Sequence, residues 1–478
     1  MKKALLLIII VFPVFNTYSQ DFAGFRTISS TGVNGVFFNP ANIADNRYKT
    51  DVNLFSISSF IGNNSASFKL KNFTQTFHPD SAAHQFFGRS AGTANGLLSA
   101  DVHGPSAMFA AGKKTTVAVT TRARLMGNVI DFDGQMVNDV FENPEISRSF
   151  PYQMTARNMA VNLNAWTEYG VSIATVLKDA GKHFIKGGIT VKLLGGAMNT
   201  YMQLGNFNAT LNEDVQTHEY LTKTTGSMVL GFSGLPTQNI RATDVIKMKS
   251  IGVGLDYGFV YEYRPDFENE DFASARNKYK LKIGVAVLDL GSIKYAKDMQ
   301  RSGAFKLNIT GNNRFYLMDL KRVDFDKYNS FFKSRRSYFV TDTAKNNITK
   351  ISVPLPSTFQ LQVDYHLRES FFINLSSAIS LSSSDSAYNS RYFGSVSLTP
   401  RFESEIADVF LPINYNKYTK FSAGLGARVG PVFFGSGSFF TSLFGKSKQA
   451  DAFIGVHING EMFRKKMGEA EVRRWGRK

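Results

Sequence analysis

Residues that could act in catalysis or hold a metal are scattered through this sequence and form no recognisable site. Seven histidines are spread along the chain without metal-ligand spacing, and there is no cysteine. The serines are abundant, but none stands in a nucleophile-elbow motif. Gly252, Gly254 and Gly258 alternate inside an expected strand, whereas a phosphate-binding loop needs a strand-to-helix junction. We therefore expect no enzymatic activity, with a membrane hydrolase only as a third alternative, and no metal or cofactor.

Four basic residues occupy strand faces that we expect to point into a barrel. They are Arg122, Arg124, Lys192 and Arg428. They could hold a ligand carboxylate or an acidic residue of the N-terminal segment such as Asp45. They could equally be solvated or paired with Asp256 and Asp364, because inward charges are ordinary in a wet lumen. The second interpretation is favoured.

The elements that would position these residues alternate with a period of two. From 251 to 263 every odd position is apolar or aromatic, while most even positions are small or charged, and residues 359–367 repeat the pattern. Weaker copies recur between short turns and long polar excursions. The excursions lie near 71–94, 128–153, 206–224, 264–278 and 319–350. This arrangement predicts an all-β fold, a transmembrane antiparallel β-barrel of about 14 strands. A secreted soluble β-protein is the alternative.

The N-terminal 49 residues divide into two parts. Residues 1–19 have the form of a signal peptide, with Lys2 and Lys3 before an apolar run and a cleavage site after Ser19. Residues 20–49 follow as a compact segment that must be buried, because it carries several apolar side chains around Asn39-Pro40. We expect the strands that follow to enclose it. The barrel would then span 50–463, and 464–478 would form a basic periplasmic tail.

The charge balance indicates which partners suit the chain. The formal net charge is +17, which favours contact with anionic lipid headgroups. No run of bases interleaved with aromatic residues resembles a nucleic-acid surface. No apolar stretch after the signal reaches the roughly 20 residues of a membrane-spanning helix. We expect a protein of the Gram-negative outer membrane, with its lipids as partners and no nucleic acid.

The segment Phe38-Asn39-Pro40-Ala41-Asn42-Ile43-Ala44, followed by a barrel of this size, resembles the long-chain fatty acid transporter family of outer-membrane proteins. The stretches 255–262, 287–294 and 421–437 also resemble an uncharacterised set of secreted barrels from Bacteroidota. The first resemblance implies that residues 20–49 are a hatch inside the lumen, with Asn39, Pro40 and Ala41 as its hinge or anchor. It implies that Phe37 and Phe38 line the apolar side of the hatch.

Two functions stay open on this basis. One is transport of a hydrophobic or amphipathic small molecule across the outer membrane. The other is a non-transporting accessory barrel that scaffolds a secretion or assembly complex with envelope protein partners. Transport predicts a continuous apolar pocket against Phe37 and Phe38 and an opening in the wall, whereas scaffolding predicts a filled lumen and a large protein-facing patch.

Three short triplets resemble the O-glycosylation sequon used in the same bacterial group. Each has an aspartate, a hydroxyl residue and an alanine, and the hydroxyl residues are Ser81, Thr343 and Ser386. All three fall in expected loops, which are exposed and tolerant of attached groups. We expect these three hydroxyl residues to be glycosylation sites.

Overall fold

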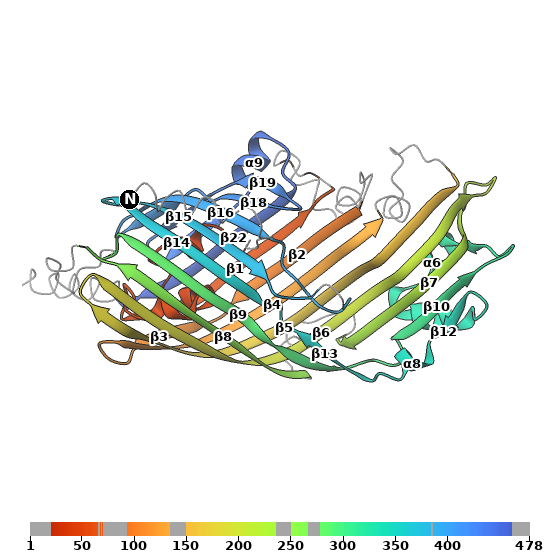
Figure 1. Cartoon of the computed structure of the whole chain (residues 1–478), viewed down its shortest axis with the longest axis horizontal. Coiled ribbons are helices and arrows are strands. Elements are labelled where there is room, and N and C mark those ends of the chain that lie inside the picture. The colour runs from red at the N-terminus through yellow and green to blue at the C-terminus, as the bar shows by residue number, and fades with distance from the viewer. Residues whose placement is uncertain are drawn as a thin grey trace, which may run out of the picture.

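The chain folds as a closed antiparallel β-barrel (Figure 1). The computed structural model describes residues 21–65, 67, 69, 93–133, 150–235, 250–265, 278–383 and 386–460. Fourteen hydrogen-bonded strands in one sheet form a ring. The ring closes where β1 (Thr50–Asn63) pairs with β22 (Gln449–Asn459), and Asp51 lies opposite Asn459. The expected all-β barrel of about 14 strands is therefore confirmed.

The other strands of the ring follow one another in chain order. Three of them consist of two segments each: β2 (Thr93–His103) with β3 (Ser106–Ala110), β17 (Ala407–Phe410) with β18 (Ile413–Asn416), and β19 (Lys420–Ala423) with β20 (Leu425–Val429). The others are β4 (Thr115–Asp133), β5 (Tyr152–Ala180), β6 (His183–Glu213), β8 (Ser250–Tyr263), β9 (Leu281–Ala296), β14 (Thr358–Arg368), β15 (Phe371–Ser380), β16 (Ser395–Glu403) and β21 (Val432–Ser436).

The wall has its apolar face outside and its polar face inside. On β8 the outward side chains Val253 and Phe259 are 67% and 49% exposed, whereas the inward Asp256 and Glu262 are buried. A soluble β-sandwich would bury the apolar face instead, so this polarity fits a wall that faces lipid. None of the helices in the described ranges has both the length and the apolar run needed to cross a membrane.

The two ends of the barrel differ in their connections. One end carries two- to four-residue turns, at 111–114, 181–182, 369–370 and 430–431, and one long connection, 264–280 between β8 and β9. The start of β1 and the end of β22 lie at the same end. The other end carries most of the long connections, together with the three-residue turn 417–419 between β18 and β19. In outer-membrane barrels short turns face the periplasm and long loops face outside, and we call the two ends periplasmic and outer on that basis.

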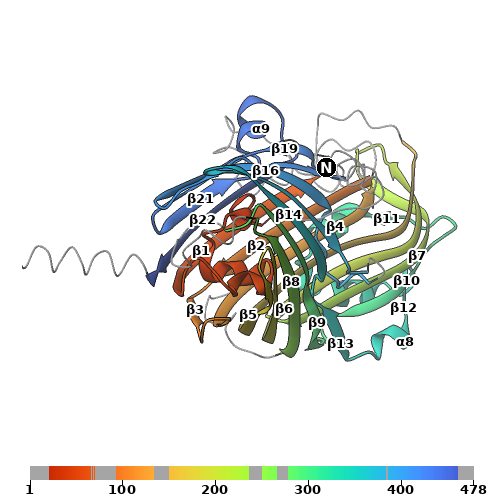
Figure 2. The same ribbon diagram turned by 60° about the vertical axis from the view of Figure 1, so that its left-hand side comes forward.

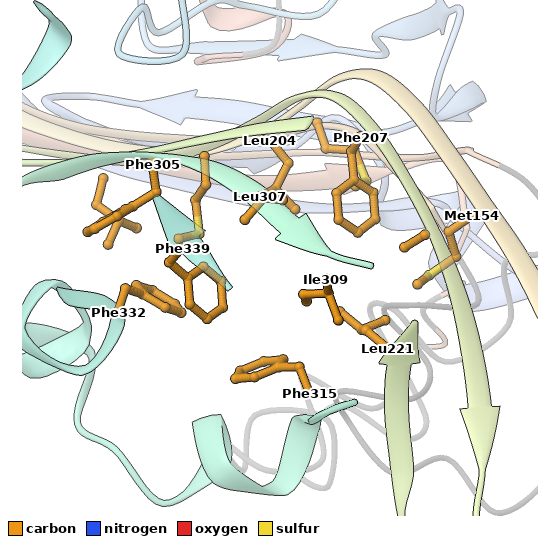
Figure 3. Packing of buried hydrophobic residues seen from close by; sticks show 14 of the residues in the cluster. Met154, Leu204, Phe207, Leu221, Phe305, Leu307, Ile309, Phe315, Phe332 and Phe339 are labelled. Carbon is orange, nitrogen blue, oxygen red and sulfur yellow. The ribbon is translucent and has the colours of Figure 1, made fainter. Parts of the chain in front are cut away.

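A lobe extends from the outer end, where β5 and β6 run on beyond the ring (right side of Figure 1). Its elements are β7 (Glu219–Gly234), β10 (Gly303–Ile309), β11 (Phe315–Tyr316), α6 (Leu317–Lys321), η6 (Phe325–Lys327), α7 (Tyr328–Ser334), β12 (Phe339–Thr341) and α8 (Thr343–Asn346). The rings of Phe305, Phe332 and Phe339 form its centre (Figure 3), and the last two have centroids 4.6 Å apart. The excursion expected near 206–224 is wrong, because β6 and β7 pair there to build this lobe. Beyond the lobe, β13 (Lys350–Pro354) returns along β9.

The N-terminal segment, residues 21–48, lies inside the ring, where Figure 2 shows it in red. It consists of three short 3₁₀ turns, η1 (Phe25–Thr27), η2 (Gly32–Phe37) and η3 (Pro40–Ile43). Most of its side chains are buried, including Phe25 and Ile43. Residues 1–19, expected as a signal peptide, and the tail 464–478 lie outside the described residues, as do 461–463.

Candidate functional site

Asn39 fixes the N-terminal segment to the wall. Its side-chain oxygen accepts a hydrogen bond from the Ala41 N–H at 2.9 Å and so caps η3. Its amide nitrogen donates to the carbonyls of Phe259 on β8 and Val285 on β9, at 3.2 and 3.1 Å. One side chain thus joins the turn to two neighbouring strands, which is the geometry of an anchor.

The wall makes room for this turn with a glycine. A Cβ on Gly188 of β6 would lie 2.5 Å from both the Ala41 nitrogen and the Pro40 carbonyl carbon. Backbone atoms cannot yield as a flexible side chain can, so the approach of η3 to β6 depends on this glycine. Lys186, two residues earlier, donates to the Ala44 carbonyl at 3.0 Å. The segment is therefore seated on β6 as well as on β8 and β9.

Phe37 and Phe38 point into different surroundings. Phe38 is buried in a cluster with Phe22 and Phe25 of its own segment and with three phenylalanines of the wall. Within that cluster Phe25 stacks on Phe433 at 3.7 Å between centroids. Phe37 instead stacks on His103 at 3.8 Å, with the Arg122 guanidinium 5.3 Å from its ring centroid. Phe38 belongs to an apolar seat, and Phe37 lies at its boundary with charged groups.

Three of the four expected inward cations lie in one buried set of charges, the charge network. Its members are Asp101, Arg122, Arg124, Glu168, Lys192, Asp256 and Asp289. The Arg124 guanidinium contacts Glu168 at 3.0 Å and Asp289 at 2.8 Å. The Lys192 ammonium contacts Asp289 at 2.5 Å and Asp256 at 2.8 Å. Asp289 has a φ of 62°, a backbone conformation that β-strands seldom contain.

Arg428 lies apart from the charge network. Its guanidinium contacts Asp408 on β17 at 2.5 Å, and Ser30 of the N-terminal segment also donates to that carboxylate. Asp45 contacts Arg264 at 2.9 Å and Lys278 at 3.7 Å, rather than any of the four expected cations. Asp364 is held by both terminal nitrogens of Arg401, each at 2.6 Å. Of the two aspartates expected as partners of these cations, Asp256 pairs with Lys192, whereas Asp364 pairs with Arg401.

A loop between β15 and β16 enters the lumen from the outer end. We call its described part, residues 386–394, the inner loop. Asn162 of β5 donates to the carbonyls of Ala387 and Asn389 at 2.8 and 2.9 Å. Asn128 of β4 donates to the Arg391 carbonyl at 2.8 Å. Side-chain amides of the wall therefore take the place of strand partners for the backbone of this loop.

Tyr392 of the inner loop contacts the N-terminal segment. The Tyr392 hydroxyl donates to the Asp21 carboxylate at 3.0 Å, and Arg124 donates to the same hydroxyl at 2.5 Å. Burial, together with the nearby Asp101 carboxylate, raises the pKa of Asp21. Burial also raises the pKa of Tyr392. The Tyr392 phenol therefore keeps its proton and can donate a hydrogen bond. Its contacts join the inner loop to the N-terminal segment and to the charge network.

An apolar layer lies in the outer half of the lumen. It consists of Phe60, Leu97, Met126, Trp166, Leu194, Ile293, Tyr295, Val353, Leu355 and Phe393. Seven of these lie on ring strands, Val353 and Leu355 lie on or directly after β13, and Phe393 lies in the inner loop. Trp166 marks the lower boundary, because its indole N–H donates to Glu168 at 2.7 Å while Arg124 lies 4.8 Å from its ring centroid.

This layer was not expected from the sequence, yet a signal for it exists. Inward positions of outer-membrane barrels are mostly polar. At Leu97-Leu98 and Leu193-Leu194 two apolar residues stand side by side and break the alternation. Leu98 and Leu193 face outward, 39% and 45% exposed, whereas Leu97 and Leu194 face inward and are buried. Doubled apolar positions on strands thus indicate an apolar interior.

A pocket of about 460 Å³ adjoins the apolar layer at the outer rim. Its lining residues are Asn64, Thr93, Asn95, Asp131, Lys417, Tyr418, Lys420 and Lys448. The Tyr418 ring also packs on Phe393, with centroids 4.4 Å apart. The pocket and the apolar layer therefore meet at the Tyr418 and Phe393 rings.

The described residues contain no group of three or more side chains suited to a metal ion. Among the expected glycosylation sites, Thr343 is exposed at the start of α8, and Ser386 is half-buried beside the buried Ala387. Ser81 lies outside the described residues. All three stay predictions.

Residues 40–437 match one protein-family model, a family of unknown function, DUF5723. This chain belongs to DUF5723. The search of curated proteins found no match for this DUF5723 member. Its kinship with secreted barrels of Bacteroidota stays a prediction.

Solved structures similar to this DUF5723 barrel include members of the transporter family that its sequence resembles. The toluene transporter TodX of Pseudomonas putida has a TM-score of 0.36 and 7% identity, with 90% of this chain and 94% of that chain covered. A FadL homologue of Pseudomonas aeruginosa has a TM-score of 0.32 and 9% identity, with 92% of this chain and 98% of that chain covered. The outer-membrane protease OmpT of Escherichia coli has a TM-score of 0.23 and 6% identity, with 86% of this chain and 95% of that chain covered. Similarity at this level carries no argument about what this chain does.

Proposed function

We propose that this protein resides in the outer membrane and passes a hydrophobic or amphipathic small molecule inward. The outward apolar face and the closed sheet support the location, because lipid leaves no partner for an open strand edge. Export would depend on the signal at 1–19. The long connections and the lobe would face outside, and the short turns and residues 464–478 would face the periplasm.

The apolar layer carries the proposal. A pore for ions or sugars has a wet, polar interior, and a wall of that kind needs no buried Leu97, Met126 or Leu194. Apolar side chains gathered inside a barrel lower the free energy of an apolar guest by roughly 25 cal/mol for each Å² of its surface that they cover. The pocket at the outer rim supplies an approach to this layer.

Two elements would close the path in the described arrangement. The inner loop covers the apolar layer from outside, and the N-terminal segment fills the lumen below the charge network. We propose that the segment acts as a hatch, with Asn39, Pro40 and Ala41 as its anchor. Opening would require both elements to move, and the contact of Tyr392 with Asp21 couples them.

The test is a search for a bound apolar molecule. Protein purified in detergent from envelopes is denatured, extracted with solvent and analysed by mass spectrometry, together with any proteins that co-purify. We expect an apolar or amphipathic compound with the wild type and its loss from a Leu97→Asn/Leu194→Asn variant. Two inward amides would leave polar groups in the layer without partners.

The doubled leucines supply a matched control. The Leu98→Asn/Leu193→Asn variant makes the same chemical change on the outward face of the same two strands. We expect it to retain the compound. Heat-dependent mobility in SDS gels shows that each barrel has formed. An intact barrel with no compound and with stoichiometric partner proteins would overturn transport and favour the scaffold alternative.

A further inference from the structure

The helix α9 (Phe439–Phe444) stands outside the barrel wall. It lies in the connection between β21 and β22, at the outer end of the ring. Figures 1 and 2 both show it projecting beyond the sheet near β19. Its sequence is Phe-Phe-Thr-Ser-Leu-Phe, and Phe444 is 81% exposed. An exposed aromatic helix is unusual on a surface that meets only water.

The polar residues of α9 face the protein. The Thr441 hydroxyl accepts a hydrogen bond from the Ala423 N–H of β19 at 2.7 Å, and Ser442 is buried. Just before the helix, Ser438 donates to Asp451 of β22 at 2.6 Å. The helix is thus fixed to two strands by its hydroxyl groups. Its apolar side is turned away, with Leu443 38% exposed and the Phe440 and Phe444 rings stacked at 6.2 Å.

That apolar side continues the lipid-facing surface of the wall. The helix packs on β19, whose Phe421 faces outward and is 57% exposed. On the neighbouring β18, Tyr415 is 55% exposed and lies opposite Phe421. Lys446 is exposed two residues beyond the end of the helix. Aromatic residues flanked by lysines are the usual composition of a membrane interface.

We propose that α9 is an interfacial anchor that lies in the outer leaflet. Phe444, Phe440 and Leu443 enter the acyl chains, and Lys446 meets the anionic groups of the lipid. The proposal rests on the membrane location proposed above, and it is independent of transport. Its occupant is lipid, because the helix continues a surface that already faces lipid and carries the complementary charge.

The absence of cysteine from the chain allows a direct measurement of depth. Single variants Phe444→Cys, Val253→Cys and Val215→Cys are labelled with a nitroxide and reconstituted into phosphatidylethanolamine–phosphatidylglycerol vesicles. Val253 is 67% exposed on the wall, and Val215 is 92% exposed in the turn between β6 and β7. Collisions with oxygen, which concentrates in lipid, and with a water-soluble nickel complex then report the environment of each label.

We expect the label at 444 to resemble that at 253, with an oxygen-to-nickel ratio several-fold above that at 215. In phosphatidylcholine vesicles, which lack net charge, we expect adding Lys446→Gln to the labelled Phe444→Cys protein to leave the oxygen-to-nickel ratio at 444 unchanged. In the anionic vesicles the substitution should move the label at 444 toward water. A water-like label at 444 with a lipid-like label at 253 overturns the anchor alone. A water-like label at 253 overturns the membrane location itself.

Discussion

Single polar side chains inside the lumen bridge separate parts of the chain, and they would hold the proposed path closed. Tyr392 contacts Asp21 of the N-terminal segment and Arg124 of the charge network. Asn39 contacts two strands and its own turn. Asn39 is buried, and the half-buried Tyr392 places its hydroxyl among buried charged groups. In such a region of low dielectric constant a hydrogen bond is strong and an unpaired group is costly. Their removal should therefore act on opening more than on the barrel.

Replacing Tyr392 by phenylalanine removes the coupling without changing the shape of the ring. A hydrogen bond to a charged group contributes about 1.5–3 kcal/mol, so we expect the ratio of closed to open protein to fall roughly tenfold or more. The measurement is the mean current through planar bilayers. The control is Tyr388→Phe in the same loop, where the ring packs against Tyr201 and the backbone carbonyl makes the polar contacts. Equal currents in the two variants would contradict the coupling.

Replacing Asn39 by alanine removes the cap of η3 and both contacts with the wall. Loss of a cap costs about 1 kcal/mol, and each lost contact with a carbonyl costs about as much again. We expect the N-terminal segment to loosen, so that a cysteine introduced at Ser29 reacts faster with a water-soluble maleimide. Asn46→Ala is the matched control, because Asn46 bonds only within its own segment among the described contacts. Unchanged reactivity at 29 would show that the anchor lies elsewhere.

At the scale of elements, alternation on single strands could be predicted, but the filling of the lumen could not. The pattern located β8 and β14 because the polarity of each residue there depends only on whether its side chain faces lipid or lumen. Asn128 and Asn162 resemble residues of a wet lumen, yet they bind a loop more than 220 residues away in the chain. The lobe was missed at 206–224 because polar lobe strands resemble a loop. Such contacts depend on distant segments that local pattern does not specify.

The fit of η3 against β6 gives a prediction about two neighbouring glycines. In Gly188→Ala the new methyl group would meet the backbone of Pro40 and Ala41 at 2.5 Å. We expect the N-terminal segment to be displaced while the ring forms normally, since β6 keeps its strand partners. In Gly187→Ala the nearest atom, at 2.9 Å, is the flexible end of Leu177, so that variant serves as the control. Maleimide reactivity at position 29 should rise only in the first variant.

For the whole molecule, the ring and its filling should be separable. The hydrogen bonds that close the ring run between β1 and β22 and involve no residue of the N-terminal segment. Removing residues 21–48 would, however, strip several wall groups of their partners. Asp408 would lose Ser30, Glu403 would lose the Ser29 N–H, and Asp51 would lose the Val33 N–H. Water entering the lumen can replace these bonds.

We therefore expect the variant lacking 21–48, with the signal retained, to insert as a folded barrel that is less stable and conducts ions. Heat-dependent mobility in SDS gels reports folding, and planar bilayers report conductance. The inner loop remains in this variant, so adding Tyr392→Phe should raise the current further because the loop then loses its contact with Arg124 as well. A folded barrel that stays silent in both variants would mean that the inner loop and the apolar layer close the path without help from the N-terminal segment.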